Sequence, residues 1–96
     1  MNATTANSDS KYTLQQTNEK FSLSVYPNPS DYSFTFEIGS YNEEVGIEIS
    51  DITGKIIFRQ NGINKIRWEA GKENSGIYFY KVNMQHNTYS GKLIKL

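Results

Sequence analysis

The sequence predicts an all-β domain, a small antiparallel β-sandwich of immunoglobulin-like shape with about seven strands. Apolar and polar residues alternate with a period of two almost throughout residues 22–96, which is the spacing of half-buried strands. Turn signals recur roughly every 8–12 residues, and no stretch of about ten or more residues has helical spacing. Because the chain has no cysteine, the Cys…Trp…Cys pattern of true immunoglobulin domains is missing, and only the architecture is predicted.

The first expected strand is a short run around Leu23 and Val25, which leads into both prolines of the chain, Pro27 and Pro29. Each proline removes an N–H group, fixes φ and makes the preceding residue extended. We therefore expect the Pro-Asn-Pro step to end one strand and turn the chain into the next. That next strand has an aromatic inner face in which alternate residues are apolar: Tyr32, Phe34, Phe36 and Ile38.

A hairpin is predicted in the middle of the chain. Val45, Ile47 and Ile49 alternate with polar residues and mark one strand, and Asp51–Lys55 (DITGK) forms the turn. Gly54 can adopt the positive φ of a tight turn, and Asp51 can accept hydrogen bonds from turn amides. We expect the return strand over Lys55–Gln60, a second turn at Asn61-Gly62, and a further strand within Ile63–Glu69.

The last two strands follow a loop over residues 70–76. Ile77–Met84 is apolar on both faces, with Ile77 and Phe79 on one and Tyr78, Tyr80, Val82 and Met84 on the other. A strand of this kind is usually central in its sheet or covered on its second face. A turn at His86-Asn87 then leads into a final strand over Thr88–Leu96.

Residues 1–20 hold only Tyr12 and Leu14 as sizeable apolar groups, which is too little buried surface to offset the entropy of ordering them. We therefore expect a linker, or the remnant of a longer chain, over 1–20 and one folded domain over 21–96. The sequence has no basic and apolar N-terminal signal and no apolar run of the roughly 18 residues that span a membrane. It is expected to be either cytoplasmic or a piece of a longer precursor.

The charges argue against nucleic acid as a partner, because Lys plus Arg and Asp plus Glu are ten each and leave no basic excess. Without cysteine, disulfides and thiolate metal sites are excluded. The single histidine, His86, lies in an expected turn and cannot form a zinc site of the usual ligands alone. Glu43-Glu44 is typical of a solvated hairpin tip, and no carboxylate pair stands out. We expect no enzyme, no metal and no cofactor.

Four aromatic residues are candidates for a sugar-binding platform: Trp68, Tyr78, Tyr80 and Tyr89. In so small a core, packing is the favoured role for these rings. An accessory β-sandwich that binds a carbohydrate or an adhesion partner remains the alternative function.

Four motifs occur in a fixed order and carry a family resemblance. They are VYPNPS at 25–30, IEISDITGKII at 47–57, GIYFYKV at 76–82 and SGKLIKL at 90–96. The series resembles the type A C-terminal sorting domain of cargo exported by the type IX (Por) secretion system of Bacteroidetes. The resemblance covers about Leu23–Leu96.

This resemblance implies a passive, non-catalytic address on an exported protein. The domain would direct an N-terminally attached cargo through the translocon of the outer membrane. A cell-surface sortase would then usually remove it, by a cut in the linker before about Phe21. The protein would thus be secreted or held at the cell surface.

The resemblance also assigns recognition residues by their match to the motifs. They are Pro27, Asn28, Pro29, Gly54, Lys55, Gly76, Ile77, Tyr78, Gly91, Lys92 and Lys95. One departure is the lack of a glycine within Ser30-Asp31-Tyr32-Ser33, where many members have one. We expect the side chain of Ser30 or Asp31 to make the turn there.

Two hypotheses describe what a receptor would recognise. The final strand, Tyr89–Leu96, could offer an unpaired edge for strand addition, with Lys92 and Lys95 meeting acidic groups of the partner. The Pro-Asn-Pro step could instead be read directly. Unpaired edges would also allow two copies to form a homodimer.

Overall fold

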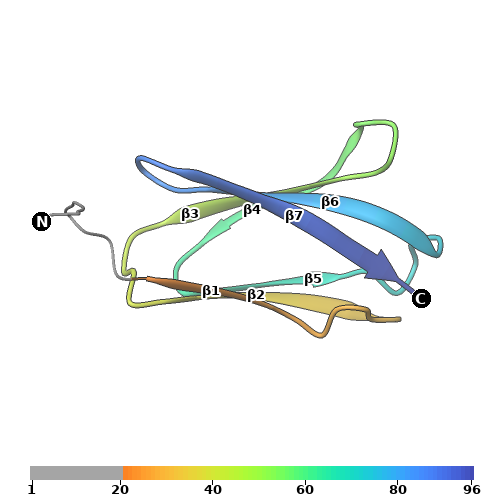
Figure 1. Cartoon of the computed structure of the whole chain (residues 1–96), viewed down its shortest axis with the longest axis horizontal. Helices are drawn as coiled ribbons and strands as arrows, with labels where there is room; N and C mark the ends of the chain where they lie inside the picture. Colours follow the sequence, from red (N-terminus) through yellow and green to blue (C-terminus); the bar gives the residue numbers. More distant parts are fainter. Residues whose placement is uncertain (1–20) are drawn as a thin grey trace, which may run out of the picture.

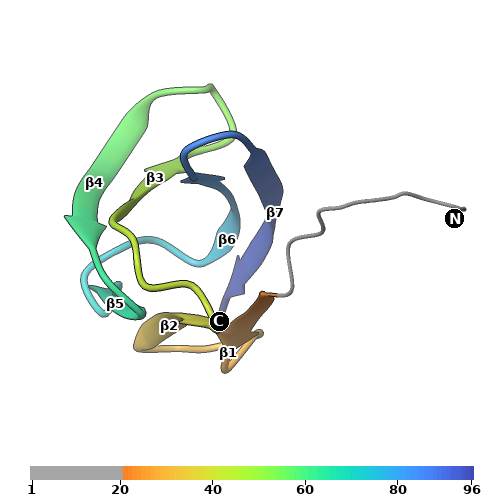
Figure 2. The ribbon, with the colours of Figure 1, turned by 90° about the vertical axis from the view of Figure 1, so that its left-hand side faces the viewer.

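The structure is a computed structural model that describes residues 21–96. Seven strands form two sheets that face each other as a sandwich (Figures 1 and 2). One sheet has the order β1 (Ser22–Tyr26), β2 (Ser33–Gly39), β5 (Lys65–Glu69), and the other has the order β4 (Ile56–Gly62), β3 (Val45–Ser50), β6 (Gly76–Asn83), β7 (Thr88–Lys95). All strand pairs are antiparallel, so the predicted all-β sandwich is confirmed.

The core lies between the sheets and consists of the residues that alternate inward. Phe34, Phe36 and Ile38 of β2 face Val45, Ile47 and Ile49 of β3, and all six are buried. Trp68 of β5 stacks on Phe34 with ring centroids 5.8 Å apart, and its second neighbour, Tyr78, packs edge-on at 5.5 Å. Large rings remove much apolar area from water per residue, which suits so small a core.

Strand β6 is central in its sheet, as predicted, since it pairs with both β3 and β7. Its inner face carries Tyr78, Tyr80 and Val82. The prediction that the strand is either central or covered on its second face is met by its central position, and the described residues leave that second face uncovered, because Ile77 is 42% and Phe79 is 44% exposed. The second face of β6 is an apolar surface open to solvent.

Tyr32 is the first of two local corrections. The alternating pattern placed it on the inner face of β2, but it lies before that strand and is 58% exposed. The Ser30 hydroxyl oxygen accepts hydrogen bonds from the amides of Tyr32 and Ser33, both at 3.2 Å, and so keeps the chain in a turn up to Ser33. The Tyr32 ring lies over Gly71 of the β5–β6 loop instead.

The second correction concerns the turn expected at Asn61-Gly62. Both residues belong to β4, and the chain turns at Ile63-Asn64. Asn64 adopts a left-handed conformation with φ of 71°, which asparagine tolerates better than most residues. Its side-chain amide donates to the carbonyl of Tyr41 at 3.0 Å, and its own carbonyl accepts from the Ile38 amide at 2.7 Å. Contacts with the β2–β3 region therefore fix the turn two residues later.

The two ends of the sandwich are built from different connections (Figure 1). The N-terminal end holds Phe21 and the connections over residues 40–44, 63–64 and 84–87. The opposite end holds the Pro-Asn-Pro step, the β3–β4 hairpin, the β5–β6 loop and the end of β7. The linker predicted over 1–20 lies outside the described residues. No helix long and apolar enough to cross a membrane is found in the described part of the chain.

Candidate recognition surface

A segment of each of the four sequence motifs lies at one end of the sandwich, and the motifs over 47–57, 76–82 and 90–96 also continue along β3, β6 and β7. We call this end the motif end and define it as residues 27–32, 51–55, 70–77 and 92–96. The register explains the meeting, because Gly76 at the start of β6 pairs with Lys95 at the end of β7, and Ser50 before the hairpin pairs with Phe79. Phe21 packs on Tyr41 and Tyr89 at the other end, where β1 begins (Figure 1).

Asn28 joins the first motif to the last. Its side-chain amide donates to the Lys92 carbonyl at 2.9 Å and accepts from the Ile94 amide at 3.0 Å. The side chain thus occupies the place that a peptide group of a neighbouring strand would take on the edge of β7. The flanking Tyr26-Pro27 and Asn28-Pro29 peptide bonds are both cis.

Ser30 continues this pairing through its main chain. Its amide donates to the Ile94 carbonyl at 3.0 Å, and its carbonyl accepts from the Leu96 amide at 2.8 Å, which forms a parallel bridge with Lys95. The edge of β7 is therefore occupied from Lys92 to Leu96. The expectation of an unpaired edge over Tyr89–Leu96 is wrong for this half of the strand, and within residues 21–96 the edge of β7 stays open to strand addition over residues 88–91.

The turn without glycine uses Ser30, one of the two side chains expected to make it. Its hydroxyl binds the Tyr32 and Ser33 amides, and the residue is buried. Its main chain forms hydrogen bonds with the end of β7, while its hydroxyl group fixes the turn that precedes β2. Ser30 was not among the residues predicted as recognition sites, and its role depends on contacts with a strand more than sixty residues away.

The central hairpin forms as its residues predicted. One Asp51 carboxylate oxygen accepts three hydrogen bonds, from the Thr53 hydroxyl at 2.6 Å, the Thr53 amide at 2.9 Å and the Lys55 amide at 3.1 Å. Gly54 has φ of 92°, a conformation that side chains rarely allow. The bond from the Thr53 hydroxyl contributes most to holding the pKa of Asp51 below its usual value, and the two amides add to it.

The start of β6 lies beside this hairpin. Gly76 adopts φ of 146°, which favours glycine, and the Tyr78 hydroxyl donates to the Asn74 carbonyl at 2.7 Å. Burial raises the pKa of Tyr78, and the negative charges of Glu73 and Asp51 raise it further. Tyr78 is buried and does not face solvent. Its contact with Asn74 therefore stabilises the β5–β6 loop.

The two lysines of the last motif differ in position. Lys92 is exposed, whereas Lys95 is only 7% exposed and points inward, with its ammonium group donating to the Leu96 main-chain oxygen at 3.1 Å. The expectation that Lys95 meets an acidic partner is therefore wrong for the folded domain. The reason is register, because Lys95 lies on the same face of β7 as buried Leu93.

Gly91 is needed for packing. The Tyr80 ring lies across it, so that a Cβ at this position would overlap the Tyr80 hydroxyl. Tyr80 also packs edge-on against Phe36 at 5.2 Å. The matched residues that remain accessible on the surface are Pro27, Asn28, Pro29, Gly54, Lys55, Gly76, Ile77 and Lys92.

The alternative function, a sugar-binding platform, was based on four aromatic rings, and two of them are not accessible. Trp68 and Tyr78 are buried in the core and unavailable to a ligand. Within residues 21–96 there is also no group of three or more histidine, cysteine, aspartate or glutamate residues placed to hold a metal ion. The geometry of this end consists of loops tied together by hydrogen bonds, with exposed apolar and basic side chains around them.

The family model described as the secretion system C-terminal sorting domain matches residues 24–96. The chain belongs to this family. The match begins just before the Pro-Asn-Pro step and runs to the last residue of the motif end. No curated protein matches the sequence at a significant level.

A sorting domain of this family is a non-catalytic signal of the type IX (Por) secretion system. It directs the attached cargo through the outer membrane, so the protein is secreted or reaches the cell surface. The domain therefore acts by being bound by the secretion machinery. Its chemistry is that of an interaction surface, and the motif end is where its sequence motifs lie.

Proposed function

We propose that the secretion machinery binds the motif end. The observation that carries this proposal is the meeting of four separate motifs at one end, while Phe21 lies at the other. Residues 21–96 would be the sorting domain and residues 1–20 the linker to the cargo. A cargo attached beyond Phe21 would then leave the motif end accessible.

Within this surface we divide the matched residues into two groups. Exposed residues such as Ile77, Lys55 and Lys92 would contact the partner. Gly91, Tyr78 and Lys95 would hold the fold, because they are packed against other parts of the domain. Asn28 would act mainly by fixing the last strand.

The finer identity belongs to the same proposal. The order and spacing of the motifs support a type A domain from a Bacteroidetes cargo. The partners would be the translocon of the outer membrane and the surface sortase, with removal of the domain by a cut before about Phe21. Where two copies associate, the homodimer would pair through open edges such as residues 88–91 of β7.

Export of a reporter tests the proposal. A fluorescent protein fused before the 96-residue chain is expressed in a host that carries the type IX system, and its extracellular fraction is measured. Lys92→Ala should lower this fraction about tenfold, as the loss of one well-formed contact of about 1.4 kcal/mol would do. The matched control is Lys65→Ala, an exposed lysine of β5 that lies outside the motif end.

Melting temperatures of both variants separate binding from folding. We expect them to differ little, since both lysines are exposed. Equal export of the two variants would contradict the proposal, and so would a loss that merely follows a lower melting temperature.

A further inference from the structure

The outer face of the four-stranded sheet carries an apolar cluster next to the motif end. Ile56, Ile77, Phe79 and Ile94 are each between 39% and 44% exposed. The register makes them neighbours, because Ile77 pairs with Ile94 and Ser50 lies between Ile56 and Phe79. We call these four residues, together with Lys81 and Lys92, the Phe79 face. Contiguous exposed apolar groups with a polar rim are typical of interaction sites.

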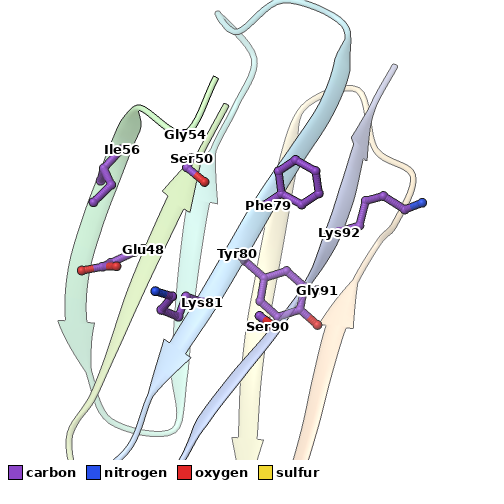
Figure 3. A pocket seen from close by; sticks show the side chains of 10 residues that line it. All are labelled: Glu48, Ser50, Gly54, Ile56, Phe79, Tyr80, Lys81, Ser90, Gly91 and Lys92. Carbon is purple, nitrogen blue, oxygen red and sulfur yellow. The ribbon is translucent and has the colours of Figure 1, made fainter. Parts of the chain in front are cut away.

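The Phe79 face is hollowed beside its central ring. A shallow groove runs over the sheet, where small residues lie between larger ones (Figure 3). Ser50 and Gly54 lie on the β3 side of Phe79, and Ser90 and Gly91 lie on β7. Side chains of a bound segment would fit beside Phe79, where the sheet carries little side-chain bulk of its own.

The free charge of this face is positive. The Glu48 carboxylate is paired with Arg59 at 3.3 Å. Lys81 and Lys92 form no ion pair with any of residues 21–96. Lys92 lies opposite Phe79 on β7, with its ammonium group pointing away from the ring, and Lys81 follows two residues later on β6, opposite Glu48 and with its ammonium group turned toward the Glu48 side of the groove (Figure 3). A carboxylate beside Phe79 would be attracted by Lys92, and one two residues further along β6 by Lys81.

We propose that the Phe79 face binds a segment of a partner protein that presents apolar side chains close to aspartate or glutamate. The apolar side chains would lie on Phe79, Ile56 and Ile94, and the carboxylates would meet Lys81 and Lys92. This inference rests on the proposed function, because Ile77 and Lys92 belong both to this face and to the motif end. It adds the chemistry of the partner and extends the surface onto the sheet.

Two other occupants fit less well. A second copy would bring the same two lysines to the same face, and like charges oppose such a contact. An anionic lipid surface would meet the same two lysines as an acidic segment, so the floor of the groove decides between these two occupants. The polar floor of Ser50 and Ser90 suits a peptide with hydrogen-bonding groups better than hydrocarbon chains.

Site-specific photocrosslinking tests this inference in the exported fusion protein. The photoreactive analogue p-benzoylphenylalanine replaces Phe79 in the full chain, in a host with the type IX system. The control carries it in place of Arg67, on the outer face of the other sheet. We expect a protein adduct from position 79 but not from position 67, and mass spectrometry should place the linked residue within about four residues of aspartate or glutamate.

Charge reversal provides the second readout. Lys81→Glu should lower the yield of the adduct about tenfold, whereas Lys65→Glu should leave it unchanged. The inference is overturned if position 79 links only to lipid, only to a second copy, or to a peptide without acidic residues, and equally if no adduct forms or if Lys81→Glu has no effect.

The outcomes of the two tests are separable. If Lys92→Ala blocks export while position 79 gives no adduct, the secretion machinery binds the motif end but not the Phe79 face. If the adduct forms and depends on Lys81 while Lys92→Ala is exported normally, the face binds a partner but the proposed role of the motif end fails.

Discussion

At the scale of single residues, Asp51 shows how one side chain fixes a motif. Its three hydrogen bonds all come from Thr53 and Lys55 and close the central hairpin. The geometry of such a turn needs no contact with the rest of the domain. This is why the hairpin followed directly from the letters DITGK, with glycine at the position of positive φ and aspartate at its start.

The lowered pKa of Asp51 predicts a pH dependence of stability. Because the folded state lowers this pKa below its usual value of 3.8, the carboxylate stabilises the fold fully above that pH. The stabilisation is lost as the pH falls through the lower pKa of the folded state. The melting temperature of the native chain should therefore exceed that of Asp51→Asn by a constant gap between about pH 5 and 7, and the gap should shrink below about pH 4.

Thermal unfolding followed by circular dichroism at several pH values measures this gap. Taking the difference between the two proteins removes the titration of the other carboxylates, which both share. A gap that stayed constant down to about pH 2.5, or that widened in acid, would contradict the account of Asp51.

Gly91 and Lys95 show the limits of reading single residues from motifs. Both match the last motif, but Gly91 is where the Tyr80 ring packs and Lys95 points into the domain. A residue can recur in a family for the fold it maintains as well as for the partner it binds. Burial separates these two roles, and it is not visible in the sequence.

At the scale of elements, the decisive feature is the edge of β7. Alternate residues of β7 direct their amide and carbonyl groups away from β6, and Asn28 and Ser30 bind these groups from Lys92 to Leu96. Ser90 belongs to the same series, and its groups face the open part of the edge. The Pro-Asn-Pro step therefore protects half of an edge strand that would otherwise invite pairing with other chains.

Hydrogen exchange tests this role of Asn28. The Ile94 and Leu96 amides should exchange slowly and the Ser90 amide quickly. In Asn28→Ala, the Ile94 amide should lose about tenfold of its protection while Leu96, held by Ser30, keeps most of its own. The loss of both side-chain hydrogen bonds should lower the free energy of unfolding by about 1–2 kcal/mol.

The control is Asn42→Ala, an exposed asparagine in the β2–β3 loop at the other end. It should leave exchange of all three amides unchanged. If Ile94 were equally protected in Asn28→Ala and in the native chain, the edge would be covered by something other than Asn28.

Local patterns predicted most of the elements, and long-range contacts account for the misses. The alternation in β2 and β3 identified the core, because burial of one sheet face imposes a period of two. The turn was predicted at the wrong position because the hydrogen bonds that fix Asn64 join it to Ile38 and Tyr41, which are distant in the sequence. The covering of β7 was missed because Asn28 is more than sixty residues away. Nothing in a local window reports such partners.

At the scale of the whole molecule, the two ends of the sandwich differ. The chain enters at the end with Phe21, where this ring packs on Tyr89 with centroids 5.2 Å apart, and the motifs gather at the other end. Under the proposed function, the seven strands would hold the loops of the motif end away from a cargo attached before Phe21. The Phe79 face extends this end along one sheet.

The site residues were predictable as a set of motifs but not as a surface. Sequence order suggested four separate signals, whereas antiparallel pairing of β6 with β3 and β7 brings three of them together, and the contacts of Asn28 and Ser30 with β7 add the first. The exposed Ile77 and Phe79 are the residues on which the proposed interaction surface depends most. A strand with apolar residues on both faces is usually central or covered on its second face, and β6 is central while no part of residues 21–96 covers its outer face.

The most direct measurement of the central claim is the extracellular fraction of the fused reporter in Ile77→Ser relative to Ile63→Ser. Both isoleucines are exposed, but Ile77 belongs to the motif end and Ile63 to the turn at the N-terminal end. If the motif end is bound by the secretion machinery, export should fall about tenfold for Ile77→Ser alone, with similar melting temperatures for the two proteins. Equal export of both variants would contradict the account.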